Sequence, residues 1–253
     1  MIEQLTSPRG DNYSYVLHDG HHDTAMLVDP VNVDPVQQFL DEEGLEPRFV
    51  VNTHGHGDHT GGNSAFREQG AELIAHRLEE NRVGDVDQIV LDGETLEVGN
   101  LDVQVIHTPG HTAGSICLRT DDGLISGDTV FLAGCGNPKY GGDTRDLFET
   151  FRDKIRPLDD SLNLYPGHDY ALRNLEFAQD CEPRNTHIEE KLEEIRERRQ
   201  SDQPPRSTLG EEKSYNPFLR YDQDSLRNNL SNIQYRDSDW DVFKELRDLR
   251  NRW

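Results

Sequence analysis

The segment 54–59 constrains this chain more than any other, because it places three imidazoles and a carboxylate within six residues. It reads His-Gly-His-Gly-Asp-His, follows an apolar run with strand character at residues 49–53, and precedes glycines that open a helical pattern at residues 61–67. Few structural roles need so many metal-capable side chains on one turn. The density indicates two metal ions rather than one, and a pair of metal ions indicates hydrolysis.

The spacing within this segment indicates how it serves two sites. His54 and His56 are two residues apart, so an extended loop can direct both side chains to one side. Asp58 and His59 come next, where the chain turns into a helix and its side chains point elsewhere. One short loop can therefore supply ligands to two adjacent metal ions, and imidazole with carboxylate suits zinc, iron and manganese.

Three further turns are expected to supply the remaining ligands. His111 lies in Thr-Pro-Gly-His-Thr, Asp128 in Ser-Gly-Asp-Thr, and His168 in Tyr-Pro-Gly-His-Asp. Taken alone, a histidine in a glycine-rich loop is usually solvated, and Asp128 can serve as a helix cap. Together with the 54–59 segment, these residues provide enough ligands for two metals: three histidines for one, Asp58 with two histidines for the other, and Asp128 as the bridge.

The bulk composition limits the class of protein. The chain has 253 residues, enough for one large or two modest domains. No apolar stretch approaches the roughly 20 residues that span a membrane, and residues 1–5 lack the regions of a secretory signal. Three cysteines without a CxxC pattern fit a reducing compartment, so we expect a cytoplasmic protein. We expect Cys117 to lie in the hydrophobic core, whereas Cys135 is either a core residue or a reactive thiol.

The net charge is −23, with 49 acidic and 26 basic residues, of which only five are lysines. Such a surface repels nucleic acid and anionic membranes. Alternatively it solvates the protein in high salt, where self-repulsion is screened. We favour a halophilic source. We expect no nucleic-acid and no membrane partner, and a monomer or weak homo-oligomer.

Short strand patterns fill the first two-thirds of the chain, interrupted by helical spacing. The predicted strands cover residues 13–17, 24–28, 49–51, 72–75, 89–91, 101–106, 115–118, 124–126 and 162–165. Turn residues at 19–22 and 121–123 predict two hairpins. The predicted helices cover residues 36–43, 63–69 and 145–155, the last with Thr144 as its N-cap.

The pattern changes near residue 172, where strand signals end. Residues 172–178 have helical spacing, Thr186 begins a capping-box motif, and another amphipathic helix closes the chain. We therefore predict a mixed α/β catalytic domain over residues 1–172 and a smaller helical, substrate-binding domain over residues 173–253.

With these segments in order, the chain resembles the metallo-β-lactamase superfamily and, within it, the glyoxalase II or hydroxyacylglutathione hydrolase family. The superfamily motifs are His-x-His-x-Asp-His at 54–59, Pro-Gly-His-Thr at 109–112, Ser-Gly-Asp-Thr at 126–129 and Gly-His-Asp at 167–169. Closer to the family are the segments 133–136, 167–170, 174–178, 207–212 and 215–218, with Leu-Arg at 246–247 and Arg-Asn at 250–251. The resemblance runs nearly end to end.

The resemblance implies a fold and a metal site. The fold is an αββα sandwich, α/β (α+β) in class, with a helical C-terminal domain. One metal would take His54, His56 and His111, the second would take Asp58, His59 and His168, and Asp128 would bridge. The cofactor is then a pair of divalent ions, zinc first, with iron and manganese as alternatives because nitrogen and oxygen ligands suit all three.

The resemblance also implies a reaction. The substrate would be a small-molecule 2-hydroxyacyl thioester, lactoylglutathione or a related thiol ester, cleaved to a hydroxy acid and a thiol as in methylglyoxal detoxification. A metal-bridging hydroxide would attack, with Asp58 and Asp128 as catalytic residues. Thiol contacts map onto Tyr170, Arg247 and Arg250, and the two arginines share a helix face from which both can bind one carboxylate.

One loop departs from the family. After residues 134–136 the family usually offers a basic residue, aromatics, an acidic residue and glycine, whereas this chain reads Asn-Pro-Lys-Tyr-Gly-Gly-Asp. Lys139 and Tyr140 are expected to supply a cation and a ring for substrate binding, shifted and stiffened by Pro138. The thiol is therefore either glutathione or a smaller one such as γ-glutamylcysteine.

Other functions compete with this interpretation. A persulfide dioxygenase of the same superfamily would use one iron held by His56, His111 and Asp128, but the long C-terminal region favours the hydrolase. A non-enzymatic binding module would not need the complete ligand set. Lactonases and nucleases share the core motifs, and the acidic surface and the C-terminal region disfavour a nuclease.

Overall fold

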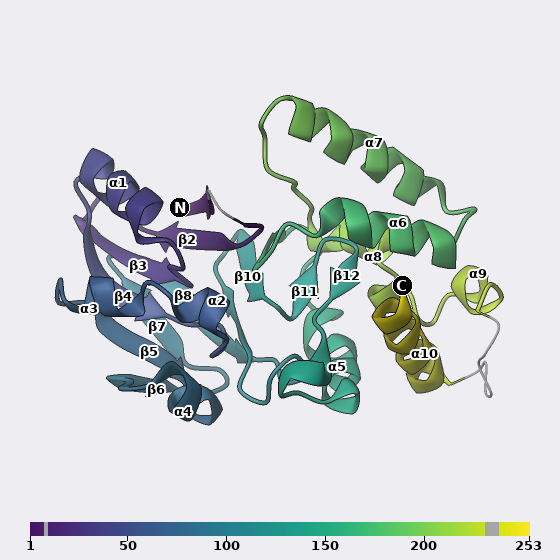
Figure 1. Cartoon of the computed structure of the whole chain (residues 1–253), viewed down its shortest axis with the longest axis horizontal. Coiled ribbons are helices and arrows are strands. Elements are labelled where there is room, and N and C mark those ends of the chain that lie inside the picture. The colour runs from purple at the N-terminus through teal and green to yellow at the C-terminus, as the bar shows by residue number, and fades with distance from the viewer. Residues whose placement is uncertain (8–9, 231–237) are drawn as a thin grey trace.

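The computed structural model describes residues 1–7, 10–230 and 238–253, and two β-sheets form its centre (Figure 1). The first sheet has the order β1-β2-β3-β4-β5-β6. Its strands are Ile2–Thr6, Tyr13–Leu17, Thr24–Val28, Glu46–Val51, Glu72–His76 and Gln88–Val90. β1 to β3 pair antiparallel, whereas β3 to β6 pair parallel. Two of the parallel pairs are connected through α1 (Val33–Glu43) and α3 (Asn63–Arg67), as parallel pairing requires.

The second sheet has the order β13-β10-β9-β8-β7. Its strands, in chain order from β7 to β10 and then β13, are Thr95–Val98, Leu101–His107, Ile116–Arg119, Gly123–Gly127 and Asn163–Pro166. The first four pair antiparallel with their neighbours, and β13 joins β10 in parallel. This one parallel pairing brings the ends of β10 and β13 to the same edge of the sheet.

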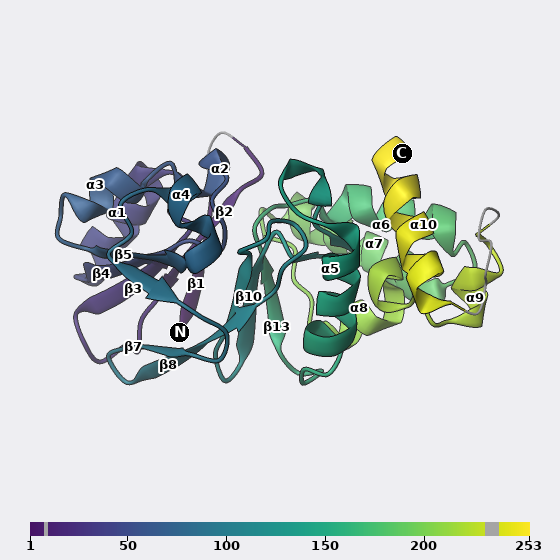
Figure 2. The same ribbon diagram turned by 90° about the horizontal axis from the view of Figure 1, so that it is seen from below.

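Apolar side chains cover both faces of each sheet, which makes a four-layer sandwich. Leu17, Val51 and Ile74 of the first sheet pack against Val105 and Leu118 of the second. The opposite face of the first sheet carries a separate cluster with the helices α1 and α3. Strands buried on both sides are apolar along their whole length, as β2 and β3 are. The predicted αββα sandwich is confirmed, and Figure 2 shows the helical layers outside the two sheets.

The outer face of the second sheet is covered by helices from the second half of the chain. The longer ones are α5 (Thr144–Thr150), α6 (Ala171–Cys181), α7 (Thr186–Gln200), α8 (Leu209–Tyr215) and α10 (Asp239–Arg252). They share one apolar cluster with Cys117, Leu124 and Leu164 of the sheet. The predicted domain boundary near residue 172 therefore stays a prediction, because the helices and the second sheet have a common core.

Shorter elements complete the described chain. They are α2 (Gly57–Thr60), α4 (Glu80–Val83), α9 (Asp224–Arg227), β11 (Val130–Phe131), β12 (Gly134–Cys135), 3₁₀ turns at Arg77–Glu79, Pro138–Tyr140 and Pro217–Leu219, and a π-helical turn at Phe151–Ile155. Within the described ranges no helix is both long and apolar enough to cross a membrane.

The predicted strands are all present, although several ends differ, and both predicted hairpins are confirmed. β1, β7, β11 and β12 were not predicted; β11 and β12 have only two residues each. The predicted helix 145–155 is correct in place, but its second half is a π-helical turn. These departures lie in elements too short, or too polar, for periodicity to reveal them.

Two predicted helix caps are wrong by one residue. Asp143, not Thr144, caps α5, because its carboxylate accepts hydrogen bonds from the backbone N–H groups of Arg145 and Asp146. Asn185, not Thr186, caps α7. In both places a side chain with a strong N-cap preference directly precedes the threonine. The capping box that the structure does contain joins Thr208 to Glu211.

A buried carboxylate ties the helical region to the β11–β12 hairpin. Glu212 accepts hydrogen bonds from Ala133 N (2.8 Å), the Tyr215 hydroxyl (2.7 Å) and Asn216 Nδ2 (2.9 Å). The Asn216 amide also donates to the carbonyls of Phe131 and Gly134. Burial raises the pKa of the Glu212 carboxyl to about 7, although these hydrogen bonds favour its ionised form.

This shift predicts a pH-dependent stability. A carboxyl whose pKa is raised on folding contributes its full stability below its ordinary pKa and loses it as the pH rises through the folded value. In Glu212→Gln this titration is absent. Between about pH 5 and about pH 7 we therefore expect the unfolding free energy to fall by about 2 kcal/mol more in the wild type than in the variant.

Urea unfolding at the two pH values measures this difference. Glu197→Gln, a substitution of an exposed carboxylate on α7, serves as the control and is expected to follow the wild type. A Glu212→Gln profile parallel to that of the wild type would contradict the expectation.

Candidate metal centre

The first ligand cluster consists of His54, His56 and His111. His54 and His56 lie on the loop between β4 and α2, and His111 lies on the loop between β8 and β9. His56 Nδ1 is 2.9 Å from His54 Nε2 and 3.0 Å from His111 Nε2. Three imidazole nitrogens thus converge on one point, which is the arrangement that holds a tetrahedral ion with one open position.

The second ligand cluster consists of Asp58, His59 and His168. Asp58 and His59 lie in α2, and His168 follows β13. His168 Nε2 is 3.2 Å from His59 Nε2 and 3.5 Å from Asp58 Oδ2. The residue pattern that separates His54 and His56 from Asp58 and His59 is therefore reproduced in space, since the two pairs enter different clusters.

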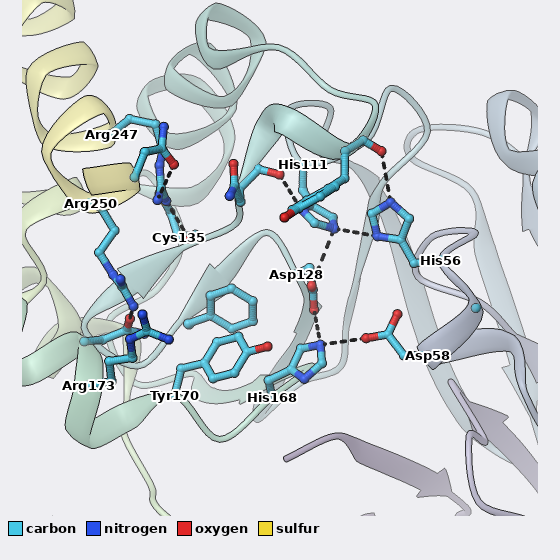
Figure 3. A pocket seen from close by; sticks show the side chains of 16 residues that line it. His56, Asp58, His111, Asp128, Cys135, His168, Tyr170, Arg173, Arg247 and Arg250 are labelled. Carbon is cyan, nitrogen blue, oxygen red and sulfur yellow. Dashed lines mark hydrogen bonds and ion pairs between the residues drawn. The ribbon is translucent and has the colours of Figure 1, made fainter. Parts of the chain in front are cut away.

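Asp128 lies between the two clusters, directly after β10 (Figure 3). Its Oδ1 is 3.3 Å from His59 Nε2 and 3.5 Å from His168 Nε2, and its Oδ2 is 3.5 Å from His111 Nε2. Asp128 Oδ1 is buried and has no hydrogen-bond partner among the described residues. A buried carboxylate oxygen without a partner is costly, and a cation shared by both clusters would satisfy it.

Electrostatics within the site follow from burial and from Asp128. Burial lowers the pKa of His54 well below its ordinary value and lowers that of His111 as well, which favours the neutral imidazole that binds metals. Burial also opposes the charge on His59, but the Asp128 and Asp29 carboxylates raise its pKa. The residues present therefore fit divalent metal ions.

A cavity of about 700 Å³ opens over both clusters. Figure 3 shows His56, Asp58 and His168 at one end and Arg173, Arg247 and Arg250 at the other. Tyr170 lies between the two ends, and its ring stacks on His168 at 4.8 Å with an interplanar angle of 4°. Of the predicted substrate contacts, Tyr140, Tyr170, Arg247 and Arg250 line the cavity, whereas Lys139 is exposed and is not among the described lining residues.

The arginine end of the cavity is held rigidly. Arg247 is buried and donates to the carbonyls of Cys135 and Gly136, both at 3.1 Å. Arg250 donates to Asn174 Oδ1 at 3.2 Å. Burial, with the neighbouring Arg173 and Arg247 guanidiniums, lowers the pKa of Arg250 to about 10.

In the described part of the chain no carboxylate lies within 4.0 Å of these guanidiniums. Arginines that have no carboxylate partner can bind an anion. Cys135 lies beside them, and burial raises the pKa of its thiol, which disfavours the reactive thiolate.

Comparison with known proteins identifies the family. The metallo-beta-lactamase superfamily model matches residues 7–174, and the model for the hydroxyacylglutathione hydrolase C-terminus matches residues 169–253. A hydroxyacylglutathione hydrolase of Anaeromyxobacter dehalogenans is 42% identical over 216 residues, 84% of this chain and 83% of that protein. One of Nitrosococcus oceani is 35% identical over 266 residues and covers both chains completely.

The chain belongs to the hydroxyacylglutathione hydrolase family. The family resemblance seen in the sequence is thereby confirmed, and the chain is an enzyme, a hydrolase of the thioester-cleaving type. A solved structure of ETHE1 from Myxococcus xanthus superposes with a TM-score of 0.70 at 25% identity, covering 93% of this chain and 92% of that one. A metallo-beta-lactamase from Staphylococcus aureus, at 21% identity and a TM-score of 0.68, shares the fold.

This member of the family orients its candidate ligands through side chains that the sequence analysis did not single out. Asp29 Oδ2 is 2.8 Å from His59 Nδ1, and Asp11 Oδ1 is 3.0 Å from His168 Nδ1. Such contacts fix the ring and leave Nε2 for the metal. Asp29 follows β3 with a positive φ of 48°, an unusual conformation at a strand end. An aspartate after an apolar strand was the only sequence signal.

Backbone carbonyls orient two further rings. His111 Nδ1 is 3.0 Å from Asn137 O, and His56 Nε2 is 3.0 Å from Tyr140 O. His56 therefore presents Nδ1 to its cluster, whereas the other histidines present Nε2. The loop that departs from the family pattern thus supports two candidate ligands through its carbonyls, a role that its side chains do not reveal.

The position of Asp128 predicts how metal binding responds to substitution. Asp128→Asn alters a group next to both clusters, so we expect the bound metal to fall in both sites. His56→Ala alters the first cluster alone and should leave about one ion per chain. Elemental analysis of protein purified without chelators measures both, with exposed His187→Ala as the control. Equal metal content in the two variants and the wild type would contradict the assignment of these ligands.

Proposed function

We propose that this chain hydrolyses a 2-hydroxyacyl thioester of a small thiol, with lactoylglutathione as the first candidate, and that two divalent ions bind in the clusters around Asp128. The observation that carries the proposal is a single cavity lined by five of the seven candidate ligands at one end and by arginines without a carboxylate partner at the other. Relatives named hydroxyacylglutathione hydrolase support the same substrate class. We propose zinc for both sites, with iron and manganese as the alternatives, since the donors are nitrogen and oxygen.

The chain's own residues define the roles around the substrate. When bound, the two ions supply an activated water and polarise the thioester carbonyl. Asp58, exposed to the cavity, is placed to orient that water. Arg247 and Arg250 bind a carboxylate of the thiol and so fix the far end of the substrate. Burial raises the pKa of Tyr170, so its hydroxyl stays protonated and can donate a hydrogen bond to the substrate.

The leaving group explains a feature of the cavity. A thiol has an ordinary pKa of about 8.5, so a thiolate leaves with little help from a general acid. Among the described lining residues the only carboxylates are Asp58 and Asp128, and both belong to the metal centre. An alcohol or amine leaving group is poorer and would gain from a carboxylic general acid, and no carboxylate of the described lining is free of the metal centre to act as one. This difference favours a thioester over an ester or amide.

We propose glutathione as the thiol and keep γ-glutamylcysteine as the alternative. Tyr140 is 66% exposed and borders the cavity, so the loop at residues 137–143 offers a ring but leaves Lys139 outside. We propose a halophilic source, because the acidic composition and the low lysine content support it. We propose a cytoplasmic location, because three cysteines without a CxxC pattern fit a reducing compartment. We also propose a monomer or weak homo-oligomer without nucleic-acid or membrane partners.

A persulfide dioxygenase with one iron is the alternative function. It would use His56, His111 and Asp128 and would leave the second cluster of Asp58, His59 and His168 without a role. The complete second cluster therefore supports the hydrolase. Oxygen consumption with glutathione persulfide, in the absence of lactoylglutathione hydrolysis, would favour the dioxygenase instead.

A turnover panel tests the proposed function. We expect metal-loaded protein to release thiol from lactoylglutathione, followed with a thiol reagent, and to cleave lactoyl-γ-glutamylcysteine less well. Asp128→Ala and His56→Ala should lower kcat/KM by at least about 100-fold, because each removes a group at the reacting centre. Unimpaired turnover in either variant, or no thiol release by the wild type, would refute the proposal; faster cleavage of the γ-glutamylcysteine ester would reassign the thiol.

The arginine subsite gives a separate prediction. Arg250→Ala should raise KM for lactoylglutathione by about tenfold or more with little change in kcat, because the lost contact binds substrate and transition state alike. Lys244→Ala, on the exposed side of the same helix, is the matched control. A substrate whose glycyl carboxylate is amidated should be cleaved equally by the wild type and Arg250→Ala. A KM that stays unchanged in Arg250→Ala would rule out the subsite.

A further inference from the structure

A buried glutamate lies behind the first cluster and takes no part in it. Glu79 ends the 3₁₀ turn Arg77–Glu79, between β5 and α4, and is 1% exposed. Its Oε2 accepts a hydrogen bond from Gly55 N and its Oε1 accepts one from Gly114 N, both at 3.0 Å. A carboxylate so deeply buried is stable only when such donors satisfy it.

The two donors lie on different loops from different sheets. Gly55 separates His54 from His56 on the loop that leaves the first sheet after β4. Gly114 lies three residues after His111 on the loop between β8 and β9 of the second sheet. One carboxylate therefore joins the two loops that supply all three members of the first cluster.

The two glycines leave the space that this carboxylate occupies. A Cβ on Gly55 would lie 2.8 Å from Glu79 Oε2, and a Cβ on Gly114 would lie 2.7 Å from Glu79 Cγ. Neither glycine has a positive φ, so backbone conformation does not require glycine at these positions. Close approach of Glu79 requires glycine at position 114, and close approach of Glu79 together with Arg82 Cβ, at 2.5 Å, requires it at position 55.

A charged neighbour extends the contact to His56. Arg82 Nη1 is 4.0 Å from Glu79 Oε2 and 3.5 Å from Tyr140 O, the carbonyl that is 3.0 Å from His56 Nε2. The second cluster has carboxylates beside its histidines in Asp29 and Asp11. The first cluster contains three histidines, and Glu79 is a carboxylate that contacts both of its loops, whereas Asp29 contacts only the first of them, at Thr53.

We propose that Glu79 is a positioning residue for the first metal: through Gly55 N and Gly114 N it holds the His54–His56 loop and the His111 loop at the separation that a three-histidine ion requires. The proposal rests on the metal site of the proposed function, but it concerns the occupancy of one cluster and not the substrate. A glutamine at this position can accept one of the two hydrogen bonds, and its NH2 group then faces the other N–H.

Zinc titration of the full chain against a chromophoric chelator tests this. In Glu79→Gln we expect one ion per chain to bind as in the wild type and the other to bind about 10- to 100-fold more weakly. Glu80→Gln, an exposed neighbour in α4, should match the wild type at both sites. Glu79→Asp keeps the charge but is too short to reach both loops. The zinc affinity of its first cluster should therefore lie between those of Glu79→Gln and the wild type.

A fold defect is separated from the proposed effect by a second variant. Gly114→Ala directs a methyl group at Glu79 Cγ and should weaken the same single site, with a circular dichroism spectrum like that of the wild type. Wild-type zinc affinity at both sites in folded Glu79→Gln, or equal weakening of both sites, would overturn the proposal. A wild type that binds two zinc ions but cleaves no lactoyl thioester would refute the proposed function and leave the Glu79 result intact.

Discussion

The Asp128 carboxylate is the interaction on which the arrangement of this site depends. It is buried between imidazoles from three chain segments, and its pKa is well below the ordinary value because, despite burial, His59, His168 and His54 favour its charge. The backbone around it is correspondingly tight. A Cβ on Gly167 would lie 2.3 Å from Asp128 Oδ1, and one on Gly136 would lie 2.0 Å from Asp128 O. Two chain segments therefore approach Asp128, one at its carboxylate and one at its backbone carbonyl, more closely than a side chain on either glycine would permit.

The sandwich makes that approach possible because its two sheets end at the same place. β4 of the first sheet delivers the 54–59 segment, and β10 and β13 of the second deliver Asp128 and His168 through their parallel pairing. Each cluster takes ligands from both sheets, so the packing of the two sheets against each other fixes the distances between ligands within each cluster. Apolar burial far from the cavity stabilises an arrangement of polar groups that would otherwise repel or remain unpaired.

Much of this was predictable from the sequence because the informative signals are local. The candidate ligands His54, Asp128 and His168 lie beside glycines at strand ends, and a short window of sequence contains each such pattern. Asp11, Asp29 and Glu79 gave no comparable signal, since their partners lie many residues away in the chain. An isolated aspartate or glutamate in this acidic sequence resembles the others until folding brings it to a particular imidazole or N–H group.

The caps and short strands were missed for a related reason. A choice between Asp143 and Thr144, or between Asn185 and Thr186, depends on one backbone dihedral angle that neighbouring residues do not determine. The Glu212 contacts to Ala133 and Asn216 likewise join segments that are distant in sequence. Periodicity identifies elements, whereas their ends and their buried polar contacts are set by tertiary packing.

Helix α6 has a consequence for substrate selection under the proposed function. It begins directly after His168 and Tyr170, and its Asn174 accepts from Arg250 while donating to Leu132 O. One short, well-packed helix therefore connects the metal centre to the arginine end, without a hinge between them. The distance between the metal centre and the arginine end is then fixed, so the cavity favours thiols whose sulfur and carboxylate are separated by a matching length. In a thiol that is one residue shorter, the carboxylate cannot reach the arginines while the thioester lies at the metal centre.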